Sequence, residues 1–460
     1  MLPKNLKYGT KIESAVARSS RVNIQPQNGT SDYTANDTII FNIPTRNNLV
    51  MVPTESYLKF QIVMKSGAAD NIFRWDSCGA HGIIQRIRVF HGSNLLQDID
   101  NYGMLAKMLF DMQQPTDGIF GKQNVLAGTR ADLSVATPAA AAALNLSVRH
   151  ANNGERLVGA ADSNGFIAAD GVSLPFTYCL NLVSLVGSLS SSSYIPLFAM
   201  TSAPLRVEIQ LVPNLINGCA AATGALTNTF TISNCEYVAN MIELGDSAMQ
   251  TIYSSLGGEP LQYVVPDFRN YQFSQTLGTS RTQVAFPIPA KFTSLKALFI
   301  TIRDKGTGAI TFFPYSSVSI GFNEYYFRLG PTTLPSKAPT TLTECFAETV
   351  KAIGSIADIN YQPSVDKASY SLAVSAANND NSTALTTSSV SSGSFYIGLD
   401  LENYASADKS SIFSGYNSNN DDCYAFITLT PAAGVTLRFD AFANFDTVVV
   451  CENGTSYVKF

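Results

Sequence analysis

The sequence predicts an all-β protein in which two similar β-sandwich units follow each other along the chain. Apolar and polar residues alternate in its regular segments, as in APLRVEIQLV at 203–212, and a period of two is typical of strands buried on one face. The order of these segments repeats once along the chain. A length of 460 residues is also enough for two domains.

The composition favours a protein that buries surface against partners. Hydrophobic residues make up 45% of the chain and charged residues only 14%, against about 25% charged in average soluble proteins. The formal net charge of −5 argues against a broad nucleic-acid groove, because phosphate binding needs a basic surface. Low charge on a large chain therefore indicates assembly with other subunits.

Residues 1–37 are expected to form an N-terminal arm. The first 21 residues carry five basic side chains and one acidic one, which are Lys4, Lys7, Lys11, Arg18, Arg21 and Glu13. This segment fits a solvated tail, a packing arm that becomes ordered on assembly, or a contact with nucleic acid or lipid. It lacks the apolar core of a secretory signal, so we expect a soluble cytosolic or nuclear product.

Residues 38–250 are expected to form the first sandwich. In SYLKFQIVM at 56–64 the side chains of Leu58, Phe60, Ile62 and Met64 should point inward. The other strand candidates of this unit are TIIFNI, IIQRIRVF, NLLQDI, FTYCLNL, APLRVEIQLV and CEYVANMIEL. Leu105, Met108, Leu109 and Met112 recur at helical spacing and predict one helix.

Residues 251–460 are expected to form the second sandwich. Its strand candidates are TQVAFPI, LKALFITI, VSIGFN, FYIGLDL, CYAFITL and VTLRFDAFANF. A helix is predicted from the spacing of Leu342, Cys345, Phe346, Val350 and Ile353. Thr341 and Glu344 precede and open this helix at the positions of a capping box.

The elements of the two units correspond in order, which predicts an internal duplication. IIFNIP at 39 corresponds to VAFPIP at 284, SYLKFQI at 56 to SLKALFI at 294, and CLNL at 179 to GLDL at 398, with the two helices between them. The first unit carries an extra loop at about 114–172, which includes the helix candidate TPAAAAALNLSV. The second has a polar stretch at 377–394 in the corresponding place.

The stretch RIRVFHGSNLLQDIDNYGMLAKMLFDMQ at 86–113 gathers polar residues that suggest a metal or catalytic site. The spacing of His91, Asp98 and Asp100 matches no metal-binding motif. HGSN suits a tight turn between two strands, and Asp100 or Asn101 suits a helix cap. We therefore predict that this stretch is scaffolding and contains no catalytic, cofactor-binding or metal-ligating residue. Asp98 or Asp100 could also form a salt bridge with Arg86 or Arg88 of a neighbouring copy, which the sequence leaves open.

No other motif predicts chemistry. His81, His91 and His150 do not stand beside a nucleophile motif, and no phosphate-binding or zinc-protease motif occurs. A carboxylate pair for glycoside hydrolysis depends on the fold and is left open. Trp75 and the many Tyr and Phe residues suit sandwich cores and subunit contacts, with a sugar-binding groove as the alternative. The odd set of seven cysteines, without a CxxC pair, suggests reduced and buried thiols.

Two segments carry a resemblance to a known family. NLVMVPTESYLKFQIV and IIQRIRVFHGSNLLQDIDNYGMLAKML resemble the capsid proteins of polinton-like viruses and virophages, with an arginine-bearing strand, an HGSN-like turn and a D-x-x-x-Y-G helix start. These belong to the double jelly-roll major capsid proteins of tailless icosahedral double-stranded DNA viruses. The detailed likeness covers Asn48 to Leu109, and the pattern of elements covers roughly 38–455. The resemblance implies two eight-stranded jelly rolls with short helices in their loops, and the loop at about 114–172 in an outer crown.

The resemblance also implies a function. The protein would be a non-enzymatic major capsid protein whose homotrimers form pseudo-hexagonal capsomers that tile an icosahedral shell in the virion. Its partners would be neighbouring capsomers, minor capsid proteins and penton proteins. The N-terminal arm would contact an inner layer, a membrane or the genome. The protein would have no cofactor and no small-molecule substrate. It would be made in the host cytoplasm and assembled there or in the nucleus. The alternatives are a minor capsid, vertex or spike protein, and a carbohydrate-binding or carbohydrate-active sandwich.

Overall fold

A computed structural model describes most of the chain. The described residues are 17–29, 32–65, 73–128, 175–190, 193–214, 219–221, 229–304, 314–354, 356–358, 360–372, 392–403 and 414–460. The helix candidate TPAAAAALNLSV, His150, most of the loop at 114–172 and most of the polar stretch at 377–394 lie outside them.

The first sandwich has two main antiparallel sheets. One sheet has the order β1 (Ala17–Ile24), β11 (Thr229–Leu244), β4 (Leu49–Lys65) and β8 (Phe176–Leu180), with β2 (Asp32–Tyr33) also paired to β11. The other has the order β3 (Thr38–Ile43), β9 (Leu205–Leu211), β6 (Ile84–His91) and β7 (Asn94–Asp100). A separate pair joins β5 (Phe73–Trp75) to β10 (Cys219–Ala221).

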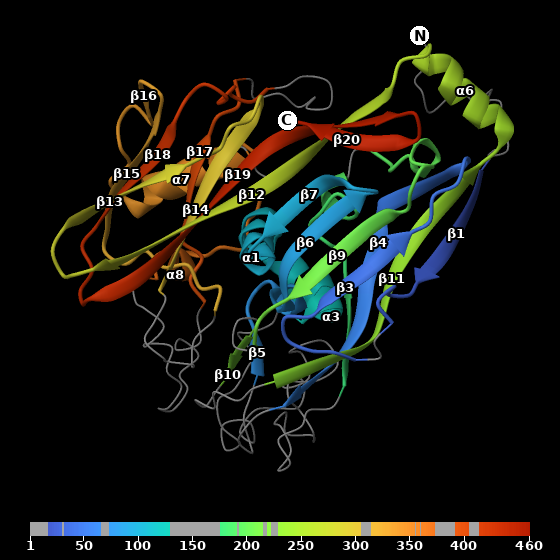
Figure 1. The fold of residues 1–460 in the computed structure, drawn as a ribbon. Helices are drawn as coiled ribbons and strands as arrows, with labels where there is room; N and C mark the ends of the chain where they lie inside the picture. Colours follow the sequence, from blue (N-terminus) through green and yellow to red (C-terminus); the bar gives the residue numbers. More distant parts are fainter. Residues whose placement is uncertain are drawn as a thin grey trace, which may run out of the picture.

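The second sandwich repeats this plan. One sheet has the order β12 (Leu261–Leu277), β19 (Val435–Glu452), β14 (Leu295–Asp304) and β17 (Tyr396–Asp400), with β20 (Thr455–Lys459) also paired to β19. The other has the order β13 (Thr282–Ile288), β18 (Cys423–Leu429), β15 (Phe322–Leu329) and β16 (Thr332–Leu334). Figure 1 shows the two sandwiches side by side.

Each sandwich is an eight-stranded jelly roll. In both, the first, eighth, third and sixth strands of the set form one sheet, and the second, seventh, fourth and fifth form the other. The predicted fold class is therefore confirmed, and so is the duplication. β3 corresponds to β13, β4 to β14 and β8 to β17, as the segment order indicated.

The strand set of the first sandwich begins inside the segment that was expected to be an arm. β1 pairs along its whole length with β11, from Ala17 opposite Leu244 to Ile24 opposite Tyr237. Residues 1–16 lie outside the described part of the chain. The division expected at 250 and 251 falls within α6 (Asp246–Leu256), which connects β11 to β12.

The period-two strands fold as expected, with one exception. In β4, Leu58, Phe60, Ile62 and Met64 are all buried, as predicted. VSIGFN was predicted as a strand, and this was wrong, because the strand begins at Phe322 and runs on to Leu329. Ile320 has a positive φ of 33° and Gly321 of 62°, so the chain turns just before β15.

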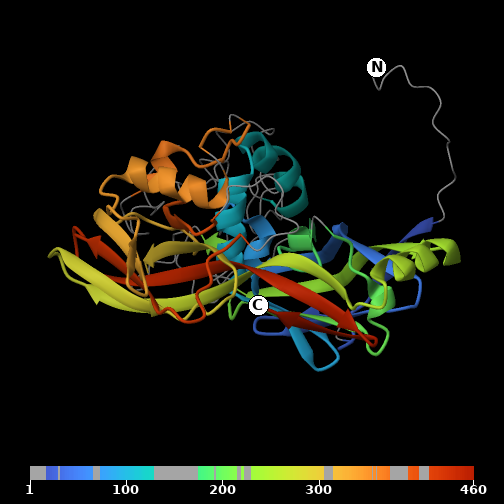
Figure 2. The same ribbon diagram turned by 90° about the horizontal axis from the view of Figure 1, so that it is seen from above.

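Short helices occupy the loops. They are α1 (Tyr102–Gln113), α2 (Thr116–Gly118), α3 (Asn124–Ala127), α7 (Leu342–Ile353) and α8 (Lys367–Tyr370), with the turns η2 (Gly79–Ile83), η3 (Ile119–Gln123), η5 (Ser188–Ser190) and η6 (Leu197–Ala199). The loop expected from 114 thus starts with the helical turns α2, η3 and α3. Figure 2 shows α1 and α7 on the same side of the molecule, above the strands.

The two predicted helices differ in how they start. At α7, Thr341 Oγ1 accepts from Glu344 N at 3.2 Å, while the Glu344 carboxylate accepts from Thr340 N at 3.2 Å, one residue before the cap. At α1 the cap position is Asn101, in a left-handed conformation and without a side-chain cap bond. The prediction of a side-chain cap by Asp100 or Asn101 was therefore wrong. No helix among the described residues is long and apolar enough to cross a membrane.

Candidate functional site

The junction between the two jelly rolls is the most elaborate polar region of the described chain, and we take it as the candidate functional site. On the first sandwich it involves α1, β6 and β7, and on the second β12, β17 and β20. The apolar core of the first sandwich continues into the second, where Val265, Phe268 and Phe442 belong to the same cluster. The two jelly rolls are therefore one packed body.

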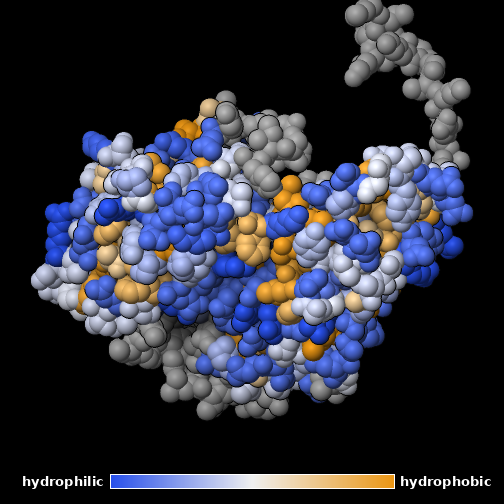
Figure 3. All heavy atoms as spheres, turned by 45° about the horizontal axis from the view of Figure 1, so that its top comes forward, coloured by the Kyte–Doolittle hydropathy of each residue, from blue (hydrophilic) through white to orange (hydrophobic). Residues whose placement is uncertain are grey.

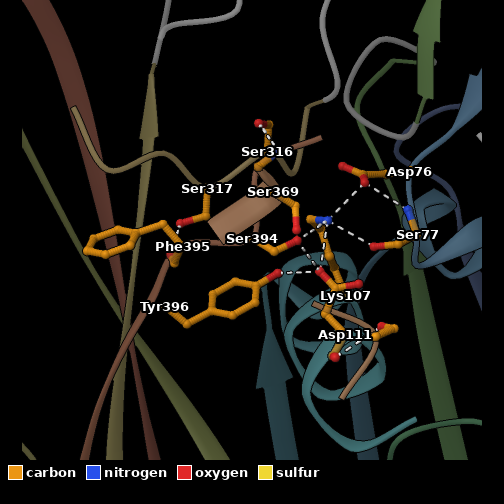
Figure 4. A network of polar contacts seen from close by, with 12 residues as sticks. Asp76, Ser77, Lys107, Asp111, Ser316, Ser317, Ser369, Ser394, Phe395 and Tyr396 are labelled. Carbon is orange, nitrogen blue, oxygen red and sulfur yellow. Dashed lines mark hydrogen bonds and ion pairs between the residues drawn. The ribbon is translucent and has the colours of Figure 1, made fainter. Parts of the chain in front are cut away.

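Lys107 of α1 is the centre of a buried ion network (Figure 4). Its side chain is 1% exposed, and its Nζ lies 3.1 Å from Asp76 Oδ1 and 3.0 Å from Asp111 Oδ2. Ser77 Oγ, at 2.9 Å, accepts a further hydrogen bond. The ammonium is thus satisfied by groups of the first sandwich.

Two residues of the second sandwich complete this network. Ser394 Oγ and Tyr396 Oη each donate to Asp111 Oδ2 at 2.7 Å. Asp111 therefore accepts one hydrogen bond from Lys107 of its own helix and two from the second sandwich. A hydroxyl that donates to a buried carboxylate offsets part of its desolvation, so docking of the sandwiches completes the site.

The electrostatics favour a permanently charged lysine. Burial by itself lowers the pKa of Lys107, but the carboxylates of Asp111 and Asp76 outweigh this effect, and the pKa is raised. Burial, with the Asp111 charge in second place, raises the pKa of Tyr396 well above its ordinary value. A lysine that holds its proton and a phenol that holds its proton do not act as base or nucleophile. The network serves to join the sandwiches.

A second polar contact crosses the junction between β7 and β12. Gln97 Nε2 donates to Asp267 Oδ1 at 2.8 Å, and Gln97 Oε1 accepts from Leu185 N at 2.7 Å. Burial raises the pKa of Asp267 to about 7, although its bonds from Gln97 and the Phe268 amide oppose the rise. This carboxyl therefore titrates near neutral pH.

His91 connects the end of the chain to the first sandwich. Its Nδ1 accepts from Ser456 N at 2.9 Å, so its Nε2 carries the proton and faces the carbonyls of Met200 and Ala203 at 3.2 and 3.1 Å. Asn94 adds a bond from its Nδ2 to Ser456 O at 2.9 Å. The HGSN turn therefore holds β20 against β6 and β7.

The other polar residues of 86–113 also have partners within the chain. Arg86 donates twice to Asp98, at 2.7 and 2.6 Å. Arg88 pairs with Glu208 at 2.9 Å, and Asp100 accepts from Gln85 and from the Asn101 amide. Arg86 and Arg88 thus form salt bridges within their own sheet rather than with a neighbouring copy. Over the described ranges, no cluster of His, Cys, Asp and Glu suits a metal ion.

The remaining candidates from the sequence lie in the core. Trp75 is 0% exposed and donates from Nε1 to Tyr178 Oη at 2.9 Å, so it lines no open groove. His81 is buried with its Nδ1 2.8 Å from Tyr102 Oη, and burial lowers its pKa to about 3. Five of the six described cysteine side chains are buried and Cys179 is half-buried, all as free thiols.

Sequence reasoning did not find the Lys107 network. Lys107 and Asp111 are four residues apart in the predicted helix, and this spacing is ordinarily an exposed ion pair. The only signal was that both stand among apolar residues on nearly every side of the helix. Ser394 and Tyr396 are too distant in sequence to be associated with them.

Two jelly rolls in tandem, joined through one core, define the double jelly-roll fold. No protein-family profile matches the sequence, and no curated protein sequence matches it. Several solved structures, however, are similar to it in fold. The capsid protein in a quasi-atomic model of the PBCV-1 capsid is similar with a TM-score of 0.60 and 9% identity, over 98% of this chain and 98% of that one.

Two further solved structures show the same fold. The mavirus major capsid protein is similar with a TM-score of 0.56 and 11% identity, over 100% of this chain and 95% of that one. The Faustovirus major capsid protein gives a TM-score of 0.57 and 10% identity, over 97% of this chain and 92% of that one. The chain therefore has the double jelly-roll fold that these viral major capsid proteins share.

Proposed function

We propose that the protein is a major capsid protein, which forms homotrimeric, pseudo-hexagonal capsomers that tile an icosahedral shell. The observation that carries this proposal is the pair of complete jelly rolls joined as one body. Two similar sandwiches per chain give a trimer six similar corners, which suits packing among six neighbours. The similarity to three viral capsid proteins over nearly the whole chain supports the same reading.

The buried junction suits this task mechanically. A shell tile transmits force between neighbours, so its two halves must keep a fixed angle. The network from Asp76 through Lys107 and Asp111 to Tyr396 fixes that angle at one point, and Gln97 to Asp267 fixes it at another. Bonds at several points along one junction restrict rotation more than a single apolar contact does.

The finer parts of the proposal concern partners and place. The chain would act in the virion without catalysis, cofactor or small-molecule substrate, beside neighbouring capsomers and minor capsid and penton proteins. We place the two inserted loops, at about 114–172 and 377–394, in the outer crown. Figure 1 supports this arrangement, since α3 and α8, which precede the loops, lie in the lower half of the view and α6 at its top right.

The native mass tests the proposal directly. Light scattering coupled to size exclusion should give three times the 49.4 kDa chain mass, and negative-stain images should show a hexagonal outline. A monomer at all concentrations up to those of particle assembly would contradict the trimer.

Two other functions make different predictions. A minor capsid, vertex or spike protein usually carries one jelly roll, and the two sandwiches here argue against it. A carbohydrate-binding or carbohydrate-active protein would bind or cleave glycans as a monomer. Glycan-array binding by a monomeric peak would favour that function over the capsid.

A further inference from the structure

An apolar groove lies beside α6, which stands at the top right in Figure 1. Its hollow has a volume of about 470 Å³, within the range of roughly 300–1,000 Å³ in which proteins bind ligands. The lining residues come from β4, β11, α6, β12 and the segment before β9, and include Val50, Tyr194, Phe198, Ile252, Leu261 and Tyr263. Figure 3 shows hydrophobic residues gathered on this face between α6 and the second sandwich.

Two large aromatic side chains beside the groove are exposed. Tyr194 is 59% exposed and Tyr253 of α6 is 54% exposed, and Tyr253 stacks edge-on against Phe198 with ring centroids 6.0 Å apart. Only Val50, Phe198 and Met249 form a small buried cluster beneath. Exposed apolar side chains around a hollow mark a binding surface.

One polar atom in the wall also lacks a partner. The Tyr263 hydroxyl is buried and has no hydrogen-bond partner among the described residues, and burial raises its pKa well above the ordinary value. It is therefore a protonated donor without an acceptor. An unpaired buried hydroxyl is unfavourable, and an occupant with a carbonyl oxygen would give it a partner.

The N-terminal segment ends beside this groove. Ala17, the first described residue, is paired with Leu244, whose side chain lines the groove. Residues 1–16 precede it, and an extended chain of that length reaches about 50 Å. A segment tethered so close has an effective concentration of about millimolar.

The composition of residues 1–16 fits the groove. The segment carries apolar side chains at intervals, namely Met1, Leu2, Leu6, Tyr8, Ile12 and Val16. It has three lysines and one glutamate, whereas the groove is flanked by Asp246 and Glu259, both exposed and each two residues from a lining residue. Its backbone carbonyls would offer acceptors to Tyr263.

We propose that residues 1–16 of the chain bind in the apolar groove beside α6 of the same chain. The apolar side chains fill the hollow, a main-chain carbonyl accepts from Tyr263, and the lysines face Asp246 and Glu259. This site goes beyond the proposed capsid function, because it concerns how the single chain covers its own apolar surface. The two proposals fail separately, because the capsid function is tested by the native mass and particle shape of the wild-type chain, and the groove by peptide binding to variants.

The test uses full-length chains and a labelled peptide of residues 1–16. The variant L2D/L6D removes two apolar anchors from the segment and changes no described residue. Fluorescence anisotropy should show the peptide binding to this variant at least about tenfold more tightly than to the wild type, whose own segment competes at high effective concentration. Equal binding to both chains, or binding to neither, overturns the proposal.

Groove variants locate the binding. Ile252→Asp or Tyr194→Ser, added to L2D/L6D, should weaken peptide binding about tenfold or more, since each removes apolar contact from the lining. Ser254→Asp on the exposed side of α6 is the matched control and should leave it unchanged. Melting temperatures report whether each variant is folded. A folded groove variant that binds the peptide normally overturns the site.

Two other occupants give distinct results. If the segment instead binds a second copy, L2D/L6D lowers the native mass by light scattering, and the same-chain assignment fails. If the groove takes lipid, phosphatidylcholine vesicles retain L2D/L6D but not its Ile252→Asp form, while the peptide binds neither. Either result overturns the proposal as stated.

Discussion

The helices α1 and α7 stand at the same place in the two jelly rolls, yet their surroundings differ. In α1 every residue from Tyr102 to Met112 is buried, whereas in α7 only Cys345, Thr349 and Val350 are. α7 covers one sheet of its own sandwich and shows its other face to solvent. α1 lies between its own sandwich and the second one, so it has no free face.

This difference shows how a duplicated unit acquires a role for only one of its copies. Lys107 in α1 is 1% exposed and pairs with two buried carboxylates, while Lys351 in α7 is 47% exposed and pairs with Glu348 at 2.6 Å. Both are lysines in a predicted helix with an acid one turn away. The hydrogen bonds from Ser394 and Tyr396 to Asp111 make the first pair part of the junction.

The largest expected effect is from Lys107→Met. It leaves Asp76 and Asp111 buried without their cation, which costs about 3–5 kcal/mol of unfolding free energy. Lys351→Met, the matched change in α7, should cost about 0–1 kcal/mol, because exposed pairs contribute little. Guanidinium unfolding of both variants measures the contrast. Equal costs would show that the junction network does not stabilise the fold.

The second effect is a pH dependence at Asp267. Its pKa of about 7 in the folded chain lies above its ordinary 3.8, so the folded state binds the proton more tightly. The contribution of Asp267 to the free energy of unfolding is therefore fully present below pH 3.8 and is lost as the pH rises towards 7. The loss is at most roughly 4 kcal/mol, which corresponds to about three pKa units. Asp267→Asn should accordingly become more stable relative to wild type between pH 4 and 8. Unfolding curves across that range check it, and a constant difference would refute the buried titration.

A smaller effect is expected from Gly103→Ala in α1. A Cβ at Gly103 would lie 2.5 Å from Tyr315 Cζ and Oη of the second sandwich. Tyr315 is fixed by its bond to Gly82 O at 2.8 Å, so overpacking should cost about 1–3 kcal/mol. Gly121→Ala is the control, because a Cβ there meets no atom within 4 Å. If thermal melting is unchanged for both, the helix and Tyr315 are not in close contact.

The smallest effect separates the two helix starts. Thr341→Ala removes the side-chain cap of α7 and should cost about 1 kcal/mol. Asn101 makes no cap bond at α1, so its role differs. Its Oδ1 accepts from Arg303 of the second sandwich at 3.3 Å. Hydrogen exchange should show faster opening of the first turn of α7 in Thr341→Ala, with α1 unaffected; faster exchange in α1 as well would mean that the cap acts through the junction.

The side-chain pattern explains why the sequence predicted β9 and missed β12 and β1, although β14 and β17 were predicted without a strict alternation. β9 buries Leu205, Val207 and Ile209 and was predicted in full, because one face meets the core and the other meets water. β12 was missed, since it contains Pro266 and its buried residues follow no simple period. β1 was assigned to the arm because seven of its eight residues are not fully buried. An edge strand needs only a neighbour to pair with, which its own residues do not reveal.

The polar residues show the same limit. The sequence indicated that HGSN makes a turn, since a turn follows from neighbours in one hairpin. It left Asp98 and Asp100 to pair with Arg86 or Arg88 of a neighbouring copy, whereas Asp98 pairs with Arg86 of the same sheet. It did not indicate that His91 would bind Ser456, or that Asp111 would accept from Ser394 and Tyr396. These partners are hundreds of residues apart, and chain distance carries no information about which surfaces meet.

By itself, the sequence determined the all-β class, the order of the strands and the duplication, because period-two patterns and turn residues act within a few residues. Only the tertiary structure decided how the two jelly rolls join. That choice depends on the fit of whole surfaces around α1 and β7, and on buried charges that are stable only when both surfaces supply their partners. The groove beside α6 arises in the same way, from five segments that meet only in the folded chain.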